Sequence, residues 1–226
     1  MKTASDVVRD FDLIASALAD APTDRPFNAP ERAVLKAVPA GARSALDVGC
    51  GDGRLARALA RRGIAVTAID VAPRMIALAR ARTRSAESIE YHVADVMHTD
   101  VLAPSYDVVV SVNMVHHVPL ARIIPRLAAL VAPGGTLVIQ DVVTRPGLRY
   151  LPINLAAAVW IRGRRLIGRD RVPKGVARLY DQHGRGETYL APSAVVGALG
   201  RHLPGVRVLH HLAWRYTAIW SRAAAT

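Results

Sequence analysis

The stretch ALDVGCGDGRLARAL, from Ala45 to Leu59, decides how the rest of the sequence is interpreted. Apolar residues and one acid lead into Gly-Cys-Gly-Asp-Gly, and the spacing of leucine and alanine after this run is typical of a helix. Glycines between a strand and a helix let the backbone adopt conformations that other residues avoid, and they let a ligand approach without a Cβ in the way. The stretch therefore predicts a ligand-binding turn between a strand and a helix.

Short apolar runs and helical patterns alternate along the chain on both sides of this turn. Strands are expected at residues 44–49, 64–70, 89–96, 106–113 and 134–143, and the last helix between them, over residues 118–132, is expected to be interrupted by Pro125. Strands joined by helices imply right-handed crossovers and a parallel sheet with helices on both faces. After a helix near Pro192–His202, the runs VRVLHHLAW and YTAIW predict an antiparallel hairpin at the sheet edge. The expected fold class is α/β, Rossmann-like and doubly wound, with a mostly parallel seven-stranded sheet.

Composition places the chain among globular proteins without naming a partner. At 226 residues it suits a single domain, and its first twenty residues read as an amphipathic helix and not as a signal peptide. The single cysteine, Cys50, agrees with a reducing compartment, so we expect a cytoplasmic protein. The formal charge of +12 comes mostly from arginine. It indicates either solvated helix faces or attraction to an anionic partner such as nucleic acid, a membrane surface or an acidic substrate.

Three acids accompany the glycine turn, one at each of the first three expected strands. Asp47 lies two residues before Gly49, Asp70 ends the second strand and Asp95 ends the third. An acid at the end of the second strand commonly binds ribose hydroxyls. Taken in order, the segments LDVGCGDG, AID, ADV and LVAPGGTLVIQD resemble the class I S-adenosylmethionine-dependent methyltransferases over residues 40–143. The segment VSVNMVHHVP is similar to the LHHL segment of the small-molecule branch that includes the ubiquinone and menaquinone biosynthesis methyltransferases.

The resemblance implies a cofactor, S-adenosylmethionine, and a role for each residue that matches the motifs. Asp47 would act at the amino group of the cofactor, Asp70 would bind both ribose hydroxyls, and Asp95 would accept a hydrogen bond from the adenine amino group. The residues expected to line the remaining parts of the cofactor are Gly49, Cys50, Gly51, Gly53, Val71, Met75, Val96 and Asn113. Cys50 is not expected to be a reactive thiol, and Met75 is equally compatible with a place in the core.

The pattern along the chain, together with the resemblance over residues 40–143, indicates how the chain is organised. A helical cap is expected over residues 1–40, a cofactor-binding core over 41–143, an acceptor-covering insert over 144–190, and a final helix and hairpin over 191–226. Ligands of open α/β sheets bind beyond the carboxyl ends of the strands, so an insert after the fifth strand would cover the site.

A nicotinamide cofactor and a metal ion are less compatible with the sequence than S-adenosylmethionine. A nicotinamide cofactor would also suit glycines followed by an acid, but the sequence has no Tyr-x-x-x-Lys pair to relay a proton. A metal site is not expected, because neither Cys-x-x-Cys nor His-Glu-x-x-His spacing occurs. The pairs His116–His117 and His210–His211 are adjacent, and adjacent side chains of a strand face opposite ways.

The acceptor is less well specified than the cofactor. Positioning of the reactants contributes more to methyl transfer than a general base does, and the candidate bases are His117, His116 and His183. The absence of an Asn-Pro-Pro-Tyr-like motif argues against methylation of flipped-out bases, so nucleic acid is not the expected partner. We expect transfer to oxygen or carbon of a small, partly hydrophobic molecule. The alternatives left open are RNA or protein methylation through the basic surface, and a non-catalytic cofactor-binding scaffold.

The insert carries one further hypothesis. The apolar run LPINLAAAVWI, residues 151–161, is followed by a stretch with seven basic residues and one acid, residues 162–178. Such a pair can rest on an anionic membrane surface, and it can equally form a lid helix with solvated arginines. Peripheral membrane contact is therefore a hypothesis, and the apolar run is too short to span a bilayer. The oligomeric state is not indicated.

Overall fold

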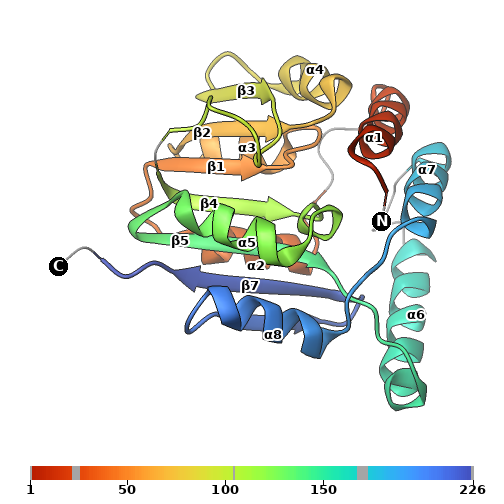
Figure 1. Ribbon diagram of the computed structural model, residues 1–226. Helices are drawn as coiled ribbons and strands as arrows, with labels where there is room; N and C mark the ends of the chain where they lie inside the picture. The colour runs from red at the N-terminus through yellow and green to blue at the C-terminus, as the bar shows by residue number, and fades with distance from the viewer. Residues whose placement is uncertain (1, 22–25, 104, 167–172, 225–226) are drawn as a thin grey trace.

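The fold is that of a computed structural model, which describes residues 2–21, 26–103, 105–166 and 173–224. Its seven strands form one sheet in the order β3-β2-β1-β4-β5-β7-β6 (Figure 1). The strands are β1 (Ser44–Val48), β2 (Ala65–Asp70), β3 (Ile89–Val93), β4 (Tyr106–Val112), β5 (Val131–Val142), β6 (Arg207–His211) and β7 (Arg215–Ser221). The first five run parallel, and β7 is antiparallel to both β5 and β6. The predicted α/β architecture and terminal hairpin are confirmed.

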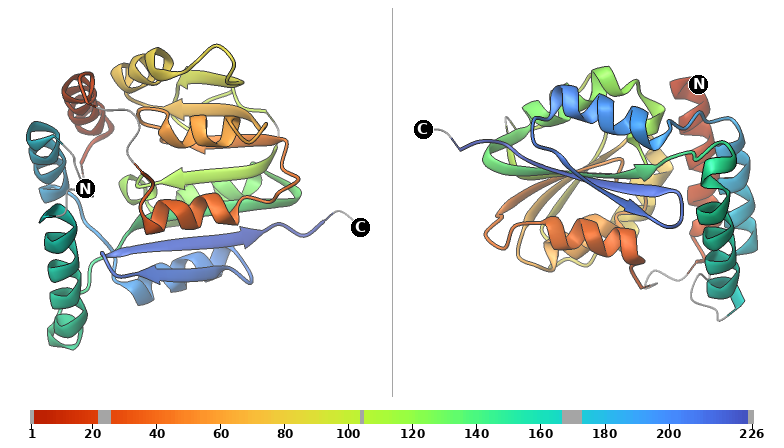
Figure 2. Two further views of the ribbon diagram at one scale, coloured as in Figure 1. Left: turned by 180° about the vertical axis from the view of Figure 1, so that it is seen from behind. Right: turned by 90° about the horizontal axis from the view of Figure 1, so that it is seen from below.

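Helices cover both faces of this sheet. Successive residues of the central strands point to opposite faces, and the residues on each face are apolar and need to be buried. Helices α5 (Leu120–Ala129) and α8 (Pro192–His202) cover one face, and α2 (Ala29–Ala37) and α3 (Arg54–Ala60) cover the other, with α4 (Pro73–Arg82) beside β3 (Figures 1 and 2). Leu46 and Val109 are buried in the first of these cores, while their neighbours Ala45 and Val108 are buried in the second. A central strand buried on both faces explains the unbroken valines of β4.

Helix α5 departs from the prediction at one residue. It was expected to be interrupted at Pro125, but it continues through this proline to Ala129. Ile123, Ile124 and Leu127 are completely buried on its inner side. Their packing against the sheet holds the helix together where the proline lacks an N–H group, so the predicted interruption was wrong.

Three helices stand beyond the carboxyl ends of the parallel strands (Figures 1 and 2). They are α1 (Ala4–Leu18), α6 (Leu151–Leu166), which follows the short helix η2 (Leu148–Tyr150), and α7 (Lys174–Arg185). Helix α1 packs against α4 and α7, so the cap and the insert meet over this edge of the sheet. The insert, which lacks clear periodicity in sequence, forms regular helices here; residues 167–172 of its predicted basic stretch lie outside the described residues. Within the described ranges, no helix combines the length and apolarity needed to cross a membrane.

Candidate active site

The glycine turn joins β1 to α3, and its three glycines have different surroundings. The φ angles are +73° at Gly49, +53° at Gly51 and +75° at Gly53, and residues with a Cβ rarely adopt such positive values. A Cβ on Gly49 would lie 2.7 Å from Cβ and Cγ of Met114, whereas a Cβ on Gly51 would meet no atom within 4 Å. Gly49 is therefore required by packing, and Gly51 leaves open space at the turn.

Asp70, at the end of β2, holds the turn in place. Its Oδ2 accepts a hydrogen bond of 2.9 Å from the N–H of Gly51, and its Oδ1 accepts one of 2.9 Å from the N–H of Ala72. Burial raises the pKa of this carboxyl, and the two backbone donors act in the opposite direction. One buried carboxylate thus joins the glycine turn to the start of α4.

Asp47, on β1, is buried without enough partners. Its side chain is part of a residue only 1% exposed, and Oδ2 has no hydrogen-bond partner among the described residues. Burial raises the pKa of Asp47 to about 7, and the negative charges of Asp70 and Asp52 act in the same direction. A buried carboxylate oxygen that lacks a donor is a position where a cationic group of a ligand can bind.

Asp95 follows β3 at the same edge of the sheet and is more accessible. Its Oδ1 accepts a hydrogen bond of 2.9 Å from the N–H of Met97, and its Oδ2 lies 3.0 Å from Nδ1 of His98. The side chain is 44% exposed, so its carboxylate can reach a ligand in solvent.

The other residues predicted at the cofactor are split between the site and the core. Met75 is buried between α1 and α4 with Ile14 and Ala72, and Val96 is buried in the core beneath α5. Their predicted contacts with adenine, like that of the partly buried Val71, stay predictions. Cys50 is buried, and burial raises the pKa of its thiol well above the usual value, in keeping with an unreactive thiol.

Asn113 marks the end of β4 at the edge of the glycine turn. Its φ of +55° is one of two positive values among the described non-glycine residues. Oδ1 of Asn113 accepts hydrogen bonds from Nε2 of Gln140, at 3.1 Å, and from Nη1 of Arg215. The strained backbone is thereby fixed to β5 and β7, and it directs the chain into the short helix η1 (Val115–His117).

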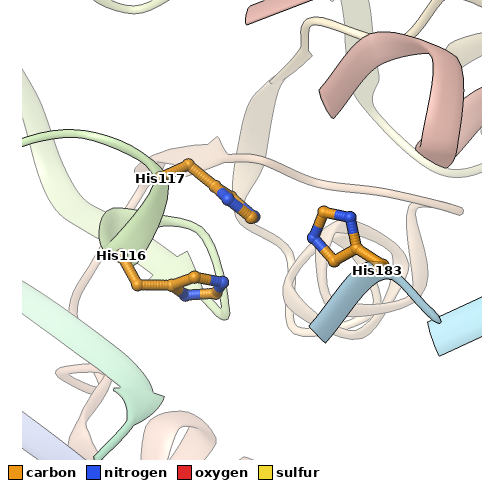
Figure 3. Close-up of side chains that lie close together, drawn as sticks. All are labelled: His116, His117 and His183. Carbon is orange, nitrogen blue, oxygen red and sulfur yellow. The ribbon is translucent and has the colours of Figure 1, made fainter. Parts of the chain in front are cut away.

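The three candidate histidines meet in space, although they come from two distant parts of the chain (Figure 3). His116 and His117 lie on η1 and His183 lies on α7, and one ligand nitrogen of each lies within 4.8 Å of the others. The ring centroids are 4.0 Å apart for His116 and His117 and 5.1 Å apart for His117 and His183. The expectation that adjacent histidines face opposite ways was wrong for this pair, because a 3-10 helix and not a strand carries them.

Acidic side chains surround these rings. Nδ1 of His116 lies 2.7 Å from Oδ1 of Asp141, which is buried on β5, and Oδ2 of Asp141 accepts the N–H of His116 at 3.0 Å. Nδ1 of His183 lies 3.0 Å from Oδ2 of Asp10, and Oε1 of Glu187 lies 3.4 Å from Nδ1 of His117. Asp10, Asp141 and Glu187 were not predicted from the sequence, because nothing in their local sequence indicates a histidine far along the chain.

A small cavity of about 170 Å³ adjoins this cluster. His116 and Asp141 form its polar wall, and apolar side chains form most of the rest. The apolar lining consists of Val115, Val118, Pro119, Leu120, Val142, Leu190 and Val195. A molecule with an apolar body and one polar group would suit such a lining.

Comparison with known proteins identifies the family of the chain. Residues 46–139 match the family model described as a methyltransferase domain. A ubiquinone biosynthesis O-methyltransferase of Xylella fastidiosa is 33% identical over 193 residues, which cover 82% of this chain and 71% of the relative. The chain belongs to the S-adenosylmethionine-dependent methyltransferases.

Further relatives match over shorter regions or through structure alone. An uncharacterized methyltransferase of Mycobacterium tuberculosis is 46% identical over 132 residues, 56% of this chain, and the match spans only 65% of that relative's length. The magnesium protoporphyrin IX methyltransferase of Synechocystis with bound S-adenosylmethionine covers 99% of both chains with a TM-score of 0.60. Its sequence identity of 15% establishes the shared methyltransferase fold alone.

The residues of this methyltransferase fit the cofactor of the family, S-adenosylmethionine. The orphaned Oδ2 of Asp47 offers an acceptor to the amino group, and the space beside Gly51 admits a ligand against the backbone. Both oxygens of Asp70 still have a free lone pair for ribose hydroxyls after accepting one backbone N–H each. Asp47, Gly51 and Asp70 therefore fit the cofactor, and their roles in binding it stay predictions.

Proposed function

We propose that the chain transfers a methyl group from S-adenosylmethionine to an oxygen of a small, partly hydrophobic acceptor. The observation that carries this proposal is the pair His116–Asp141 at the wall of an apolar cavity. An acceptor hydroxyl releases its proton as its oxygen attacks the methyl group, and His116 can accept that proton as a general base.

The histidine is oriented for that role. With Nδ1–H donated to Asp141, the neutral ring of His116 keeps its Nε2 lone pair as the acceptor of a proton. Asp141 is itself fixed, since it also accepts the N–H groups of His116 and of Val142. When bound, S-adenosylmethionine would be held by Asp47, Gly51 and Asp70 and would supply a methyl group on a sulfonium, which would leave as a neutral thioether once the acceptor oxygen took the methyl group. The hydroxyl proton passes to Nε2 of His116.

Magnitudes indicate what the residues contribute. Positioning of two reactants is worth about 7–11 kcal/mol, and a general base gives about 10²–10⁴-fold. The cavity and the glycine turn therefore matter more than His116, whose loss is expected to leave measurable turnover.

The named relative supports an oxygen acceptor. The protein of Xylella fastidiosa is named for O-methylation in ubiquinone biosynthesis, and the match to it runs over most of this chain. A phenol or catechol with an apolar tail is the acceptor class that combines this chemistry with the cavity lining.

The exposed helix α6 supports a second part of the proposal, contact with an anionic membrane surface. Leu155, Val159 and Trp160 on this helix are 58%, 72% and 54% exposed, and Arg149 and Arg162 flank them. Exposed apolar side chains beside basic residues suit an interface of acyl chains and anionic headgroups. The helix is anchored from its other side, because Asn154 donates to the carbonyl of Arg145 and accepts from Nε1 of Trp214. Such contact would bring hydrophobic acceptors close to the cavity.

A panel of acceptors tests the proposed activity. Purified protein is incubated with S-adenosylmethionine and, in separate reactions, catechols with and without an apolar tail, total RNA and a mixture of proteins, and methylated products are identified by mass spectrometry. The proposal predicts an O-methylated phenolic product, formed faster when the tail is present. Methyl transfer to RNA or protein and to no small molecule would contradict it, as would binding of S-adenosylmethionine without turnover on any class.

A further inference from the structure

Among the residues that the structure describes, the polar atoms at the centre of the histidine cluster have no hydrogen-bond partner. They are both ring nitrogens of His117, Nε2 of His183 and both carboxylate oxygens of Glu187. The side chains are 8%, 6% and 1% exposed, respectively, so solvent does not replace the missing partners. Native structures rarely leave several buried polar atoms unsatisfied in one place, and a bound ion is one of the recognised reasons.

One of these atoms from each of the three residues lies close to the others. Oε1 of Glu187 lies 3.4 Å from Nδ1 of His117 and 3.8 Å from Nε2 of His183. Ligand atoms on a common ion at about 2.0–2.2 Å are separated by roughly 3–3.5 Å, so small side-chain rotations would bring all three to ligand distances. His116 lies beside them, with a ligand nitrogen within 4.8 Å of those of the other two histidines.

The second layer of contacts is also that of a metal site. Nδ1 of His183 lies 3.0 Å from Oδ2 of Asp10, which leaves Nε2 for an ion. A carboxylate on the far nitrogen of a ligating histidine fixes its tautomer and ring orientation. Lys2 lies 3.1 Å from the same Nδ1, and its ammonium is paired with Asp10 at 2.5 Å. The acid therefore holds both groups.

The burial of the cluster also favours an ion. The carboxyl group of Glu187 is 1% exposed and lies against two buried imidazoles. A buried carboxylate needs a charged or hydrogen-bonding partner, and a divalent cation bound between these side chains would be such a partner. A neutral imidazole is the form that binds metals.

We propose that His117, His183 and Glu187 bind a divalent transition-metal ion, with zinc as the best match, at the acceptor side of the cofactor site. Two imidazoles and one carboxylate suit zinc or iron and not magnesium or calcium, which prefer oxygen ligands. Three protein ligands leave a position open, as in catalytic zinc sites, and His116 stands next to it. That the open position receives the acceptor oxygen rests on the proposed function. The metal site itself does not rest on it.

Zinc binding is measured directly, without cofactor or acceptor, on tag-free protein stripped with a chelator and dialysed. Isothermal titration with zinc chloride is combined with metal analysis after equilibrium dialysis, and cobalt chloride serves as a spectroscopic probe. We expect one zinc per chain, a visible cobalt spectrum of a nitrogen-ligated site, and no comparable binding of magnesium. The variants His117→Gln, His183→Gln and Glu187→Gln are expected to bind zinc at least about 100-fold more weakly, and Asp10→Asn about 10–100-fold more weakly.

The control is His210→Gln, since His210 is an exposed histidine on the edge strand β6, outside the cluster. It is expected to bind zinc like the unmodified protein. Thermal melting of each apo variant shows whether it folds, and any one folded variant among the three ligand positions suffices for the test. Absence of stoichiometric zinc binding by the unmodified protein would overturn the proposal, as would equal affinity in the folded cluster variants. Because no methyl transfer is involved, this outcome is distinct from failure of the proposed activity.

Discussion

Nδ1 of His116 and Oδ1 of Asp141 lie 2.7 Å apart at the wall of the cavity, although the two residues are 25 positions apart in the chain. The pair is formed because β4 and β5 are parallel neighbours, so that η1, which follows β4, begins beside the carboxyl end of β5. A buried acid behind an imidazole that lines a cavity is the arrangement expected of a general base.

Asp141→Asn is therefore expected to lower kcat without weakening the binding of the cofactor. A neutral amide no longer stabilises the imidazolium formed when His116 takes a proton, and the expected loss is about 10²–10⁴-fold. The measurement is turnover on the best acceptor of the panel, together with S-adenosylmethionine affinity. Asp181→Asn, an exposed acid on α7, is the matched control and should keep native turnover. Native turnover in the folded Asp141→Asn variant would remove His116–Asp141 from the mechanism.

Two glycines of one turn are expected to respond differently to the same substitution. Gly49→Ala and Gly51→Ala both place a side chain at positive φ, which costs about 1–2 kcal/mol of unfolding free energy. Gly49→Ala also drives a Cβ against Met114, which adds about 1–3 kcal/mol. Gly51→Ala fills open space and should mainly weaken the binding of S-adenosylmethionine. Denaturant unfolding and cofactor titration of both variants check this, and equal stability losses with equal affinities would contradict it.

The raised pKa of Asp47 predicts a dependence of stability on pH. Between about pH 4 and pH 7 the folded chain keeps this proton while the unfolded chain releases it, so the contribution of Asp47 to the free energy of unfolding falls as pH rises. The difference between 3.8 and about 7 corresponds to at most about 4 kcal/mol. The free energy of unfolding of Asp47→Asn minus that of the unmodified protein should therefore be larger at pH 8 than at pH 5. Urea unfolding at both values measures it, and a stability difference that is the same at both would show that Asp47 titrates normally.

The exposed face of α6 predicts binding to anionic vesicles. Sedimentation with phosphatidylglycerol vesicles should recover the protein, phosphatidylcholine vesicles should not, and added salt should weaken the binding. Leu155→Glu with Trp160→Glu should abolish it, because both side chains would then carry charge into the acyl region. Val101→Glu changes an equally exposed apolar residue away from α6 and should have no effect. Equal binding to both lipids, or no effect of the double substitution, would exclude this membrane contact.

The sheet could be predicted from sequence because each strand and its neighbours obey local rules. The valines of β4, the glycines after β1 and the close spacing of β6 and β7 each predict their own structure. Pro125 was misjudged because packing of three buried residues on α5 outweighs a local helix breaker. Long-range contacts were beyond local pattern: His183 meets His117 only because the insert folds into α7 and packs against α1.

The candidate cofactor residues could be predicted from the sequence for the same reason as the sheet. Asp47 and Asp70 lie at strand ends next to a recognisable turn, so their neighbourhood could be anticipated. The acids around the histidines could not be anticipated, since Asp10 lies within α1 and Glu187 follows α7, and the partners of these helices are set by tertiary packing. Burial of Glu187, which is the basis of the metal proposal, has no signature in the sequence.

Titration of S-adenosylmethionine into the unmodified protein and into Asp70→Ala tests the central claim most directly, namely that the glycine turn and its acids form the cofactor site. The substitution removes the acceptor of the ribose hydroxyls and the carboxylate that holds the N–H of Gly51. We predict micromolar binding that falls about 100-fold or more in Asp70→Ala, since each hydrogen bond to a charged group is worth about 1.5–3 kcal/mol. Asp100→Ala, an exposed acid in the loop after β3, should bind as the unmodified protein does. Equal affinity in Asp70→Ala and the unmodified protein would contradict the account.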